Sequence, residues 1–394
     1  MTIKKAVGKL HLWLGLTSGL VVFVISITGC IYAFQTEIQN LTQSFRYVEL
    51  QNKSFLPPSE MRVIAEKELP GKKIHSVNYL DAGDAAVVSF YSFDPEYYYL
   101  IYLNPYSGEV LQVKDMSKDF FRFILMGHFY FWLPPDIGQP LVASSTLVFL
   151  VMMISGIILW WPRNKGAKKQ RFSIKWNARW RRKNYDLHNV LGFYMTWIVI
   201  IIALTGLVWG FKWFANGAYF AFSGGEERQE YSEPLSDSLA RHTSADLPVD
   251  KIWHQIKKEH STAEAIEVHF PETAESSIAV SINPDADTYW KTDYRFFDQY
   301  TLKELSVNHM WGRFHEATIA DKALRMNYDV HVGAILGLPG KILAFFASLI
   351  AASLPITGFY IWWGRRKKKD RHILKNDIVK RSRNIKTKEY AEEL

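Results

Sequence analysis

The chain has 394 residues, of which 48% are hydrophobic, and its formal net charge is +8. This charge does not indicate nucleic acid as a partner, because 25 of the 47 Lys and Arg residues lie in three short stretches, 4–9, 162–184 and 365–394. The single cysteine, Cys30, excludes an internal disulfide and a cluster of thiolate metal ligands.

Four uncharged apolar stretches of 22 or 23 residues follow one another along the chain, at 12–34, 139–161, 189–211 and 342–363. A bilayer core about 30 Å thick needs about 20 apolar residues in a helix, so each stretch predicts a membrane span. Buried helices of a soluble domain rarely run this long without charge. The sequence therefore predicts a membrane α-helical protein, a four-helix transmembrane bundle in a lipid bilayer.

The basic residues orient these spans. They precede the first span and follow the second and the fourth, whereas the long segments 35–137 and 214–330 are acidic, with net charges of −4 and −9. The positive-inside rule places both termini in the cytoplasm and the two long segments on the outer side of a multi-pass protein.

Each long segment predicts a helix followed by short strands. In the first, the pattern favours a helix at 58–69 and alternating strands at 73–80, 85–93 and 97–105. In the second, a helix at 249–260 precedes three similar alternating runs. We expect two small α/β units, each a helix with an antiparallel sheet of three or four strands.

The second half of the chain repeats the first. "KLHLWLG" and "DLHNVLG" open the first and third spans, and in both spans 18 positions separate the histidine from the glycine of a later Thr-Gly pair. "ISGIILWWPR" and "ITGFYIWWGR" close the second and fourth spans. Both halves begin inside, so they form a parallel internal duplication related by an axis along the membrane normal.

This symmetry places four histidines at two depths. His11 and His188 share a level near the inner surface, and His128 and His331 share one near the outer surface. Two imidazoles on opposite sides of one iron hold b-type haem, so two levels predict two haems between four helices. A proton relay, another metal or structural roles are alternatives, although histidine pairs alone make a poor closed zinc or copper site.

The outer pair does not fall on straight membrane helices. His128 precedes Pro134 and Pro135, and His331 precedes Pro339 by eight residues. We expect each of these histidines on a short helix that folds back over the bundle.

Other residues near the histidines suit a flat macrocycle. Gly15 and Gly192, four residues after the inner histidines, leave space on the same helix face. Arg122 and Arg325 each stand six residues before an outer histidine and are candidate partners for haem propionates. The alternative for both arginines is an ordinary interfacial anchor.

The segment "NHMWGRFHEA" has no counterpart in the first half. Its residues His309, Trp311, Arg313 and His315 predict a substrate-facing loop above the outer haem. Two alternatives stay open: His315 replaces His331 as a haem ligand, or the segment is a solvated loop.

The duplicated helices, the Leu-His openings, the Trp-Trp-x-Arg closings and the turn "NPYSGEVL" resemble the PepSY-associated transmembrane family. The resemblance implies a bacterial inner (cytoplasmic) membrane location, two periplasmic PepSY-like domains, and a haem-containing reductase of ferric siderophores. Outer-sphere electron transfer needs no general acid, base or nucleophile, so no catalytic residue is predicted.

No G-x-G-x-x-G or P-loop is present, so the electrons are expected from quinol or a separate cytoplasmic reductase. A di-haem reductase of a different periplasmic acceptor is one alternative. A membrane-anchored PepSY binding or regulatory protein without redox activity is the other.

The domain organisation alternates membrane helices with outer domains and ends in a basic tail. The predicted boundaries are 1–34 for the N-terminus and first membrane helix, 35–137 for the first periplasmic domain, 138–161 for the second helix, 162–185 for the basic cytoplasmic loop, 186–213 for the third helix, 214–330 for the second periplasmic domain, 331–363 for the segment with the fourth helix, and 364–394 for the basic cytoplasmic tail.

Overall fold

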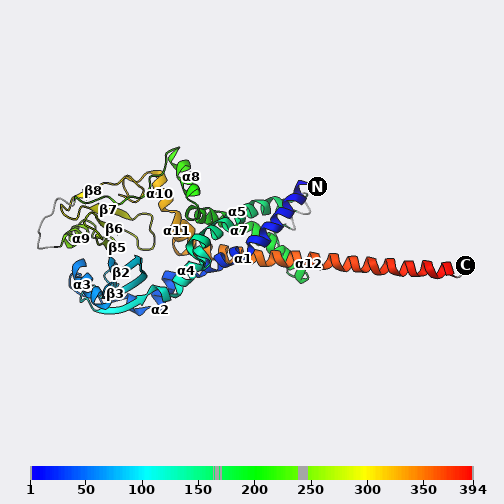
Figure 1. The fold of residues 1–394 in the computed structure, drawn as a ribbon, viewed down its shortest axis with the longest axis horizontal. Coiled ribbons are helices and arrows are strands. Elements are labelled where there is room, and N and C mark those ends of the chain that lie inside the picture. The colour runs from blue at the N-terminus through cyan, green and yellow to red at the C-terminus, as the bar shows by residue number, and fades with distance from the viewer. Residues whose placement is uncertain (1, 163, 165–167, 169–170, 238–246, 393–394) are drawn as a thin grey trace.

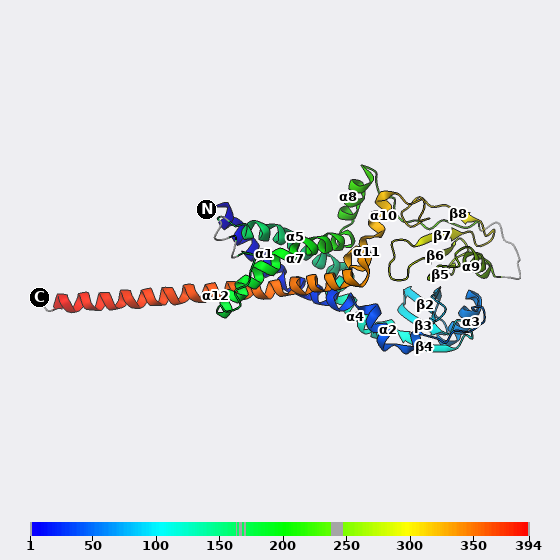
Figure 2. The same cartoon turned by 180° about the vertical axis from the view of Figure 1, so that it is seen from behind.

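The computed structural model describes residues 2–162, 164, 168, 171–237 and 247–392, with only the backbone described for 367–392. A helical bundle carries a β-sheet domain at one end, and the C-terminal helix runs out beyond the other end (Figure 1, Figure 2). We call the end at the sheet domain the sheet end of the bundle, and the opposite end the tail end. Parts of the predicted basic loop, including Arg163, lie outside the described residues.

Among the residues that the structure describes, four helices are long and apolar enough to cross a membrane, which confirms the predicted spans. The chain is a multi-pass membrane protein. The first, third and fourth of these helices extend past the predicted stretches at the tail end, where charged residues continue them, whereas the second begins at Pro135, before its predicted start. The four helices are α1 (Ile3–Tyr32), α5 (Pro135–Trp160), α7 (Trp180–Gly210) and α12 (Gly337–Glu392).

The repeat is visible in how these helices pack. Helices α1 and α7 each contact both α5 and α12, so corresponding helices of the two halves lie diagonally across the bundle. The centre is filled by a cluster that includes Val22, Phe149, Val199 and the small residues Ala347 and Ala351. Small residues allow helix backbones to approach closely in a membrane, where packing rather than the hydrophobic effect drives association.

The sheet domain differs from the prediction of two separate α/β units. Strands β1 and β5 pair antiparallel, with Val77 opposite Val268, and this pairing joins both halves into one eight-stranded antiparallel sheet of order β4-β3-β2-β1-β5-β6-β7-β8. Each half alone would expose β1 or β5 as an unpaired edge, and the pairing satisfies both edges at once. The strands are β1 (Ile74–Tyr79), β2 (Ala86–Phe93), β3 (Glu96–Leu103), β4 (Val110–Asp115), β5 (Ala265–His269), β6 (Ile278–Asn283), β7 (Asp293–Phe297) and β8 (Glu304–Leu305).

One hydrophobic core serves both halves of the sheet. Helices α3 (Pro58–Glu68) and α9 (Pro248–Glu259) contribute Met61 and Trp253 to it, and alternate strand residues such as Phe90 point into the same cluster. Ser59 at the start of α3 donates from its backbone N–H to Asp250 Oδ1 of α9 over 2.9 Å, so the two helices are also joined directly.

Short helices carry the chain between the sheet and the bundle. Asp119 caps α4 by accepting a hydrogen bond from the Arg122 backbone N–H at 2.7 Å, and Thr318 and Asp321 form a capping box at α10. The connecting helices are α2 (Gln35–Thr42), α4 (Phe120–Tyr130), α8 (Lys212–Ser223), α10 (Ile319–Arg325) and α11 (Asn327–His331).

Phe90 and Phe93 on β2 test the shared core, because Phe90 is 0% exposed and Phe93 is 82% exposed. We expect Phe90→Ala to lower the free energy of unfolding by about 3–5 kcal/mol, the usual cost of a cavity of this size. Phe93→Ala is the control and should change it by less than about 0.5 kcal/mol. Urea unfolding of the full chain in detergent, followed by tryptophan fluorescence, measures both. Equal effects would contradict the packing described here.

Candidate functional site

The four predicted histidines occupy both ends of the bundle. His11 of α1 and His188 of α7 line a cavity of about 370 Å³ near the tail end. His128 of α4 and His331 of α11 line a second cavity of about 160 Å³ near the sheet end. Both outer histidines thus stand on short helices before the spans, and each pair combines one residue from either half of the repeat.

The outer pair has a defined mutual geometry. The ring centroids of His128 and His331 are 6.0 Å apart, and their planes meet at 69°. Two metal–imidazole bonds of about 2 Å each, added to the ring radii, require a centroid separation of roughly 6 Å. The separation of the two rings therefore matches the distance at which two imidazoles can bind one metal atom.

The Nδ1 atoms of the outer histidines are already bonded. His128 Nδ1 lies 2.8 Å from the Ile25 carbonyl oxygen, and His331 Nδ1 lies 3.0 Å from the Ile202 carbonyl oxygen. A carbonyl oxygen only accepts, so each Nδ1 donates its proton and each Nε2 keeps a free lone pair. Metal-binding histidines show this pattern, in which a second-shell acceptor fixes the tautomer and the ring plane.

The inner histidines follow the same rule with hydroxyl acceptors. His11 Nδ1 lies 2.8 Å from Ser155 Oγ, and His188 Nδ1 lies 2.8 Å from Thr357 Oγ1. These hydroxyls donate their own hydrogen bonds to backbone carbonyls. Ser155 donates to Met152 over 2.9 Å, and Thr357 donates to Ser353 over 2.9 Å. Each hydroxyl therefore accepts from Nδ1, and Nε2 is again the free nitrogen.

A Ser-Gly or Thr-Gly pair holds every one of the four rings. Beside the hydroxyl, the glycine leaves space that a side chain would fill: a Cβ on Gly29 would lie 3.1 Å from His128 Cε1, and one on Gly358 would lie 3.3 Å from His188 Cε1. From the sequence, the Thr-Gly pairs mark the repeat and their glycines are expected to thin the helices, but the pairs are not recognisable as partners of the histidines. Their fourfold recurrence was the available signal, at Thr28-Gly29, Ser155-Gly156, Thr205-Gly206 and Thr357-Gly358.

The predicted glycines Gly15 and Gly192 do line the inner cavity. Gly15 faces Met152, whose Cε would lie 2.9 Å from an added Cβ. Val22 and Phe149 line both cavities, so these two side chains stand between the inner and the outer histidine levels.

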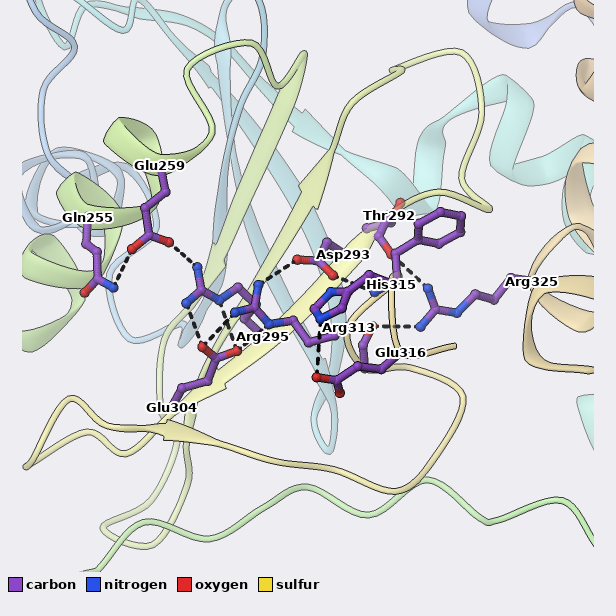
Figure 3. A network of polar contacts seen from close by, with 12 residues as sticks. Gln255, Glu259, Thr292, Asp293, Arg295, Glu304, Arg313, His315, Glu316 and Arg325 are labelled. Atoms are coloured by element: carbon purple, nitrogen blue, oxygen red, sulfur yellow. Dashed lines mark hydrogen bonds and ion pairs between the residues drawn. The ribbon is translucent and has the colours of Figure 1, made fainter. Parts of the chain in front are cut away.

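The predicted propionate partners bind the sheet domain instead of the outer cavity. Arg325 is 3% exposed and donates three hydrogen bonds to backbone carbonyls, over 2.6 Å to Met310, 2.7 Å to Gly312 and 3.1 Å to Thr292. Figure 3 shows Arg325 beside Thr292. The Arg122 guanidinium lies 5.0 Å from the ring centroid of Tyr98. Burial lowers the pKa of Arg325. This geometry gives no support to a role of either arginine in holding haem carboxylates.

The predicted substrate loop is bound within the sheet domain. His309 is buried, with Nε2 at 3.1 Å from the Ser232 carbonyl and Nδ1 at 3.2 Å from the Trp311 backbone N–H, and burial lowers its pKa. Arg313 pairs with Asp293 at 3.2 Å. Arg313 also joins a network with Glu304, Arg295 and Glu259 (Figure 3).

His315 does not take the place of His331. It is solvent-exposed and lies 3.5 Å from the carboxylate of Glu316 (Figure 3). The ring that faces His128 is that of His331. This position gives no support to His315 as a ligand at the outer level, and His331 stays the candidate.

The described part of the chain is a multi-pass membrane protein with paired candidate ligand sites. It has four apolar helices, an antiparallel sheet at one end of them, and the two histidine-lined cavities. The chain belongs to the PepSY-associated TM region family, and the match covers residues 9–365. Among curated proteins, no significant match to the sequence was found.

The two arginines make a matched test of what holds the short helices to the sheet domain. Arg325→Ala removes three hydrogen bonds and leaves buried carbonyls unpaired, so we expect the free energy of unfolding to fall by more than about 3 kcal/mol. Arg122→Ala removes one ring contact and should cost about 0.5–1 kcal/mol. Thermal melting of the two purified variants gives the order directly. Arg325→Ala melting at the temperature of the unchanged chain would show that the three bonds are unimportant.

Proposed function

We propose that the chain is a di-haem membrane protein that carries electrons from the tail end to the sheet end of its bundle and reduces an acceptor there. The observation that carries the proposal is the outer histidine pair, with ring centroids 6.0 Å apart and both Nδ1 atoms engaged by the protein. The inner pair has the same donor set in a larger cavity.

The donor set favours haem over a metal ion held by protein alone. Within the described ranges, no group of three or more His, Cys, Asp or Glu residues could hold an ion. Structural zinc sites use four protein ligands and catalytic ones three, whereas haem iron takes only two axial ligands from the protein. Two histidines per level, with glycines beside the rings, fit the two axial ligands that haem iron takes from a protein.

Each part of the site then has a role. The histidines supply axial Nε2 atoms, and the Ser-Gly and Thr-Gly pairs fix the tautomer and ring plane. Haem, when bound at both levels, supplies one-electron oxidation and reduction. Val22 and Phe149, which line both cavities, would separate the two cofactors.

The proposed orientation in the membrane is argued from the basic residues of the sequence, and the proposed electron acceptor from the family resemblance. The basic residues of the tail end support a cytoplasmic location for both termini, so the sheet domain would face the periplasm of a bacterial inner membrane. By family resemblance we propose ferric iron in a siderophore as the acceptor, since the weaker Fe(II) complex releases its metal. The electron donor would be quinol or a cytoplasmic reductase.

An absorption spectrum of the detergent-purified protein, oxidised and dithionite-reduced, with a pyridine haemochrome count, tests the haem assignment. We expect the reduced α-band of low-spin b haem and about two haems per chain. His128→Ala and His331→Ala should each lose about one haem, because each removes one axial ligand of the same level. His315→Ala is the control and should keep both haems. A colourless protein from haem-replete cells would refute the proposal and leave the sheet domain as a binding module.

The orientation has its own test in single-cysteine variants made after Cys30→Ser. A membrane-impermeant maleimide added to intact spheroplasts should label Ser107→Cys, at the β3–β4 turn, and should not label Ser382→Cys in the tail. Labelling of both positions after lysis controls for reactivity. The reverse pattern in intact spheroplasts would invert the proposed topology.

A further inference from the structure

The two cavities differ in charge. The inner cavity is lined at the tail end by Arg171 and Arg365, together with Tyr185 and Asn189. The described lining of the outer cavity contains no Lys, Arg, Asp or Glu, and its polar groups besides the histidines include Tyr32 and Gln139. The inner cavity alone therefore presents cationic side chains to an occupant.

Neither guanidinium pairs with a carboxylate among the side chains that the structure describes. Arg171 Nη1 lies 3.2 Å from Asn189 Oδ1 and 3.4 Å from Tyr185 Oη, which are long contacts to neutral groups. No ion pair joins Arg171 or Arg365 to a carboxylate within the described part of the chain. Arg366, the neighbour of Arg365 in the sequence, is not part of the cavity lining. Its guanidinium carbon lies 5.7 Å from the centroid of the Trp362 ring.

The sequence around the tail end supplies almost no acid to neutralise these residues. Between Asp136 and Glu226 the one acidic residue is Asp186, and between Asp329 and Asp370 there is none. Asp186 is 2% exposed and already bound, by Arg182 Nε at 2.9 Å and by the Lys175 backbone N–H at 3.3 Å. Among the side chains that the structure describes, no carboxylate neutralises the two cavity arginines, so both are available to an anionic group from outside the polypeptide.

Such a site is built for carboxylate groups. The planar fork of a guanidinium binds a carboxylate through two parallel hydrogen bonds. We propose that Arg171 and Arg365 bind the carboxylates of a planar cofactor whose other contacts are His11 and His188. This inference rests on the proposed function, and it assigns the carboxylate edge of the inner cofactor to the tail end. The phosphate of an anionic lipid offers similar chemistry, and the experiment separates the two.

The test is a redox titration of the full-length protein in detergent, comparing the unchanged chain with Arg171→Gln and Arg365→Gln. Loss of a nearby positive charge favours the ferric form, so one of the two midpoint potentials should move to a more negative value while the other stays. A His188→Ala variant, which lacks the inner haem, identifies which potential belongs to the inner site. Arg366→Gln is the matched control and should leave both potentials in place.

Charge-conserving variants guard against misfolding. Arg171→Lys and Arg365→Lys keep the cation but lose the fork, so their inner potentials should lie between those of the Gln variants and the unchanged protein. Both Gln variants binding two haems with unchanged potentials would overturn this inference and leave the proposed function standing. A fall in co-purifying phospholipid per chain with unchanged potentials would assign the arginines to lipid instead. An unchanged protein without haem would refute the proposed function and the inference together.

Discussion

The hydrogen bond from each histidine Nδ1 to a neighbouring helix is the interaction on which the site depends. It holds the imidazole plane, selects the tautomer and leaves Nε2 as the only free nitrogen. At the outer pair the acceptors are the carbonyls of Ile25 and Ile202. At the inner pair they are hydroxyls, which are available because Ser155 and Thr357 donate their own protons to carbonyls three or four residues earlier. The adjacent glycine then lets the ring approach the backbone, and a Cβ on Gly206 would lie 3.3 Å from His331 Cε1.

The two halves of the internal repeat meet twice, once in the helical bundle and once in the sheet. Pairing of β1 with β5 ties the two halves together at the end where His128 must face His331. The second half adds a direct link: Asp329, two residues before His331, is 0% exposed and accepts hydrogen bonds from the backbone N–H groups of Tyr289 and Trp290 at 3.1 and 2.9 Å. Burial raises the pKa of Asp329, while the two N–H groups act in the opposite direction. The position of the outer histidine thus depends on the sheet domain as well as on the membrane helices.

The two ends of the bundle are chemically unequal despite this symmetry. The inner level has Arg171 and Arg365 at its mouth, whereas the outer level is bounded by neutral groups and by Trp209, whose ring lies 5.2 Å from that of His331. A cofactor at the inner level would be anchored by charge and one at the outer level by packing. Under the proposed function this inequality would give the two haems different potentials, because the environment of a haem sets its potential.

Much of this protein can be predicted from its sequence because the relevant signals are local or repeated. The length of an apolar helix is dictated by bilayer thickness, so the four spans follow from composition alone. The duplication places histidines from the two halves at matching depths before any fold is known. Non-local decisions lie beyond such signals: that β1 pairs with β5, that Arg325 binds carbonyls of its own sheet domain, and that the hydroxyl of Ser155 meets His11 from 144 positions away. Each of these depends on which groups remain unsatisfied once the chain is packed, and only the tertiary structure determines that.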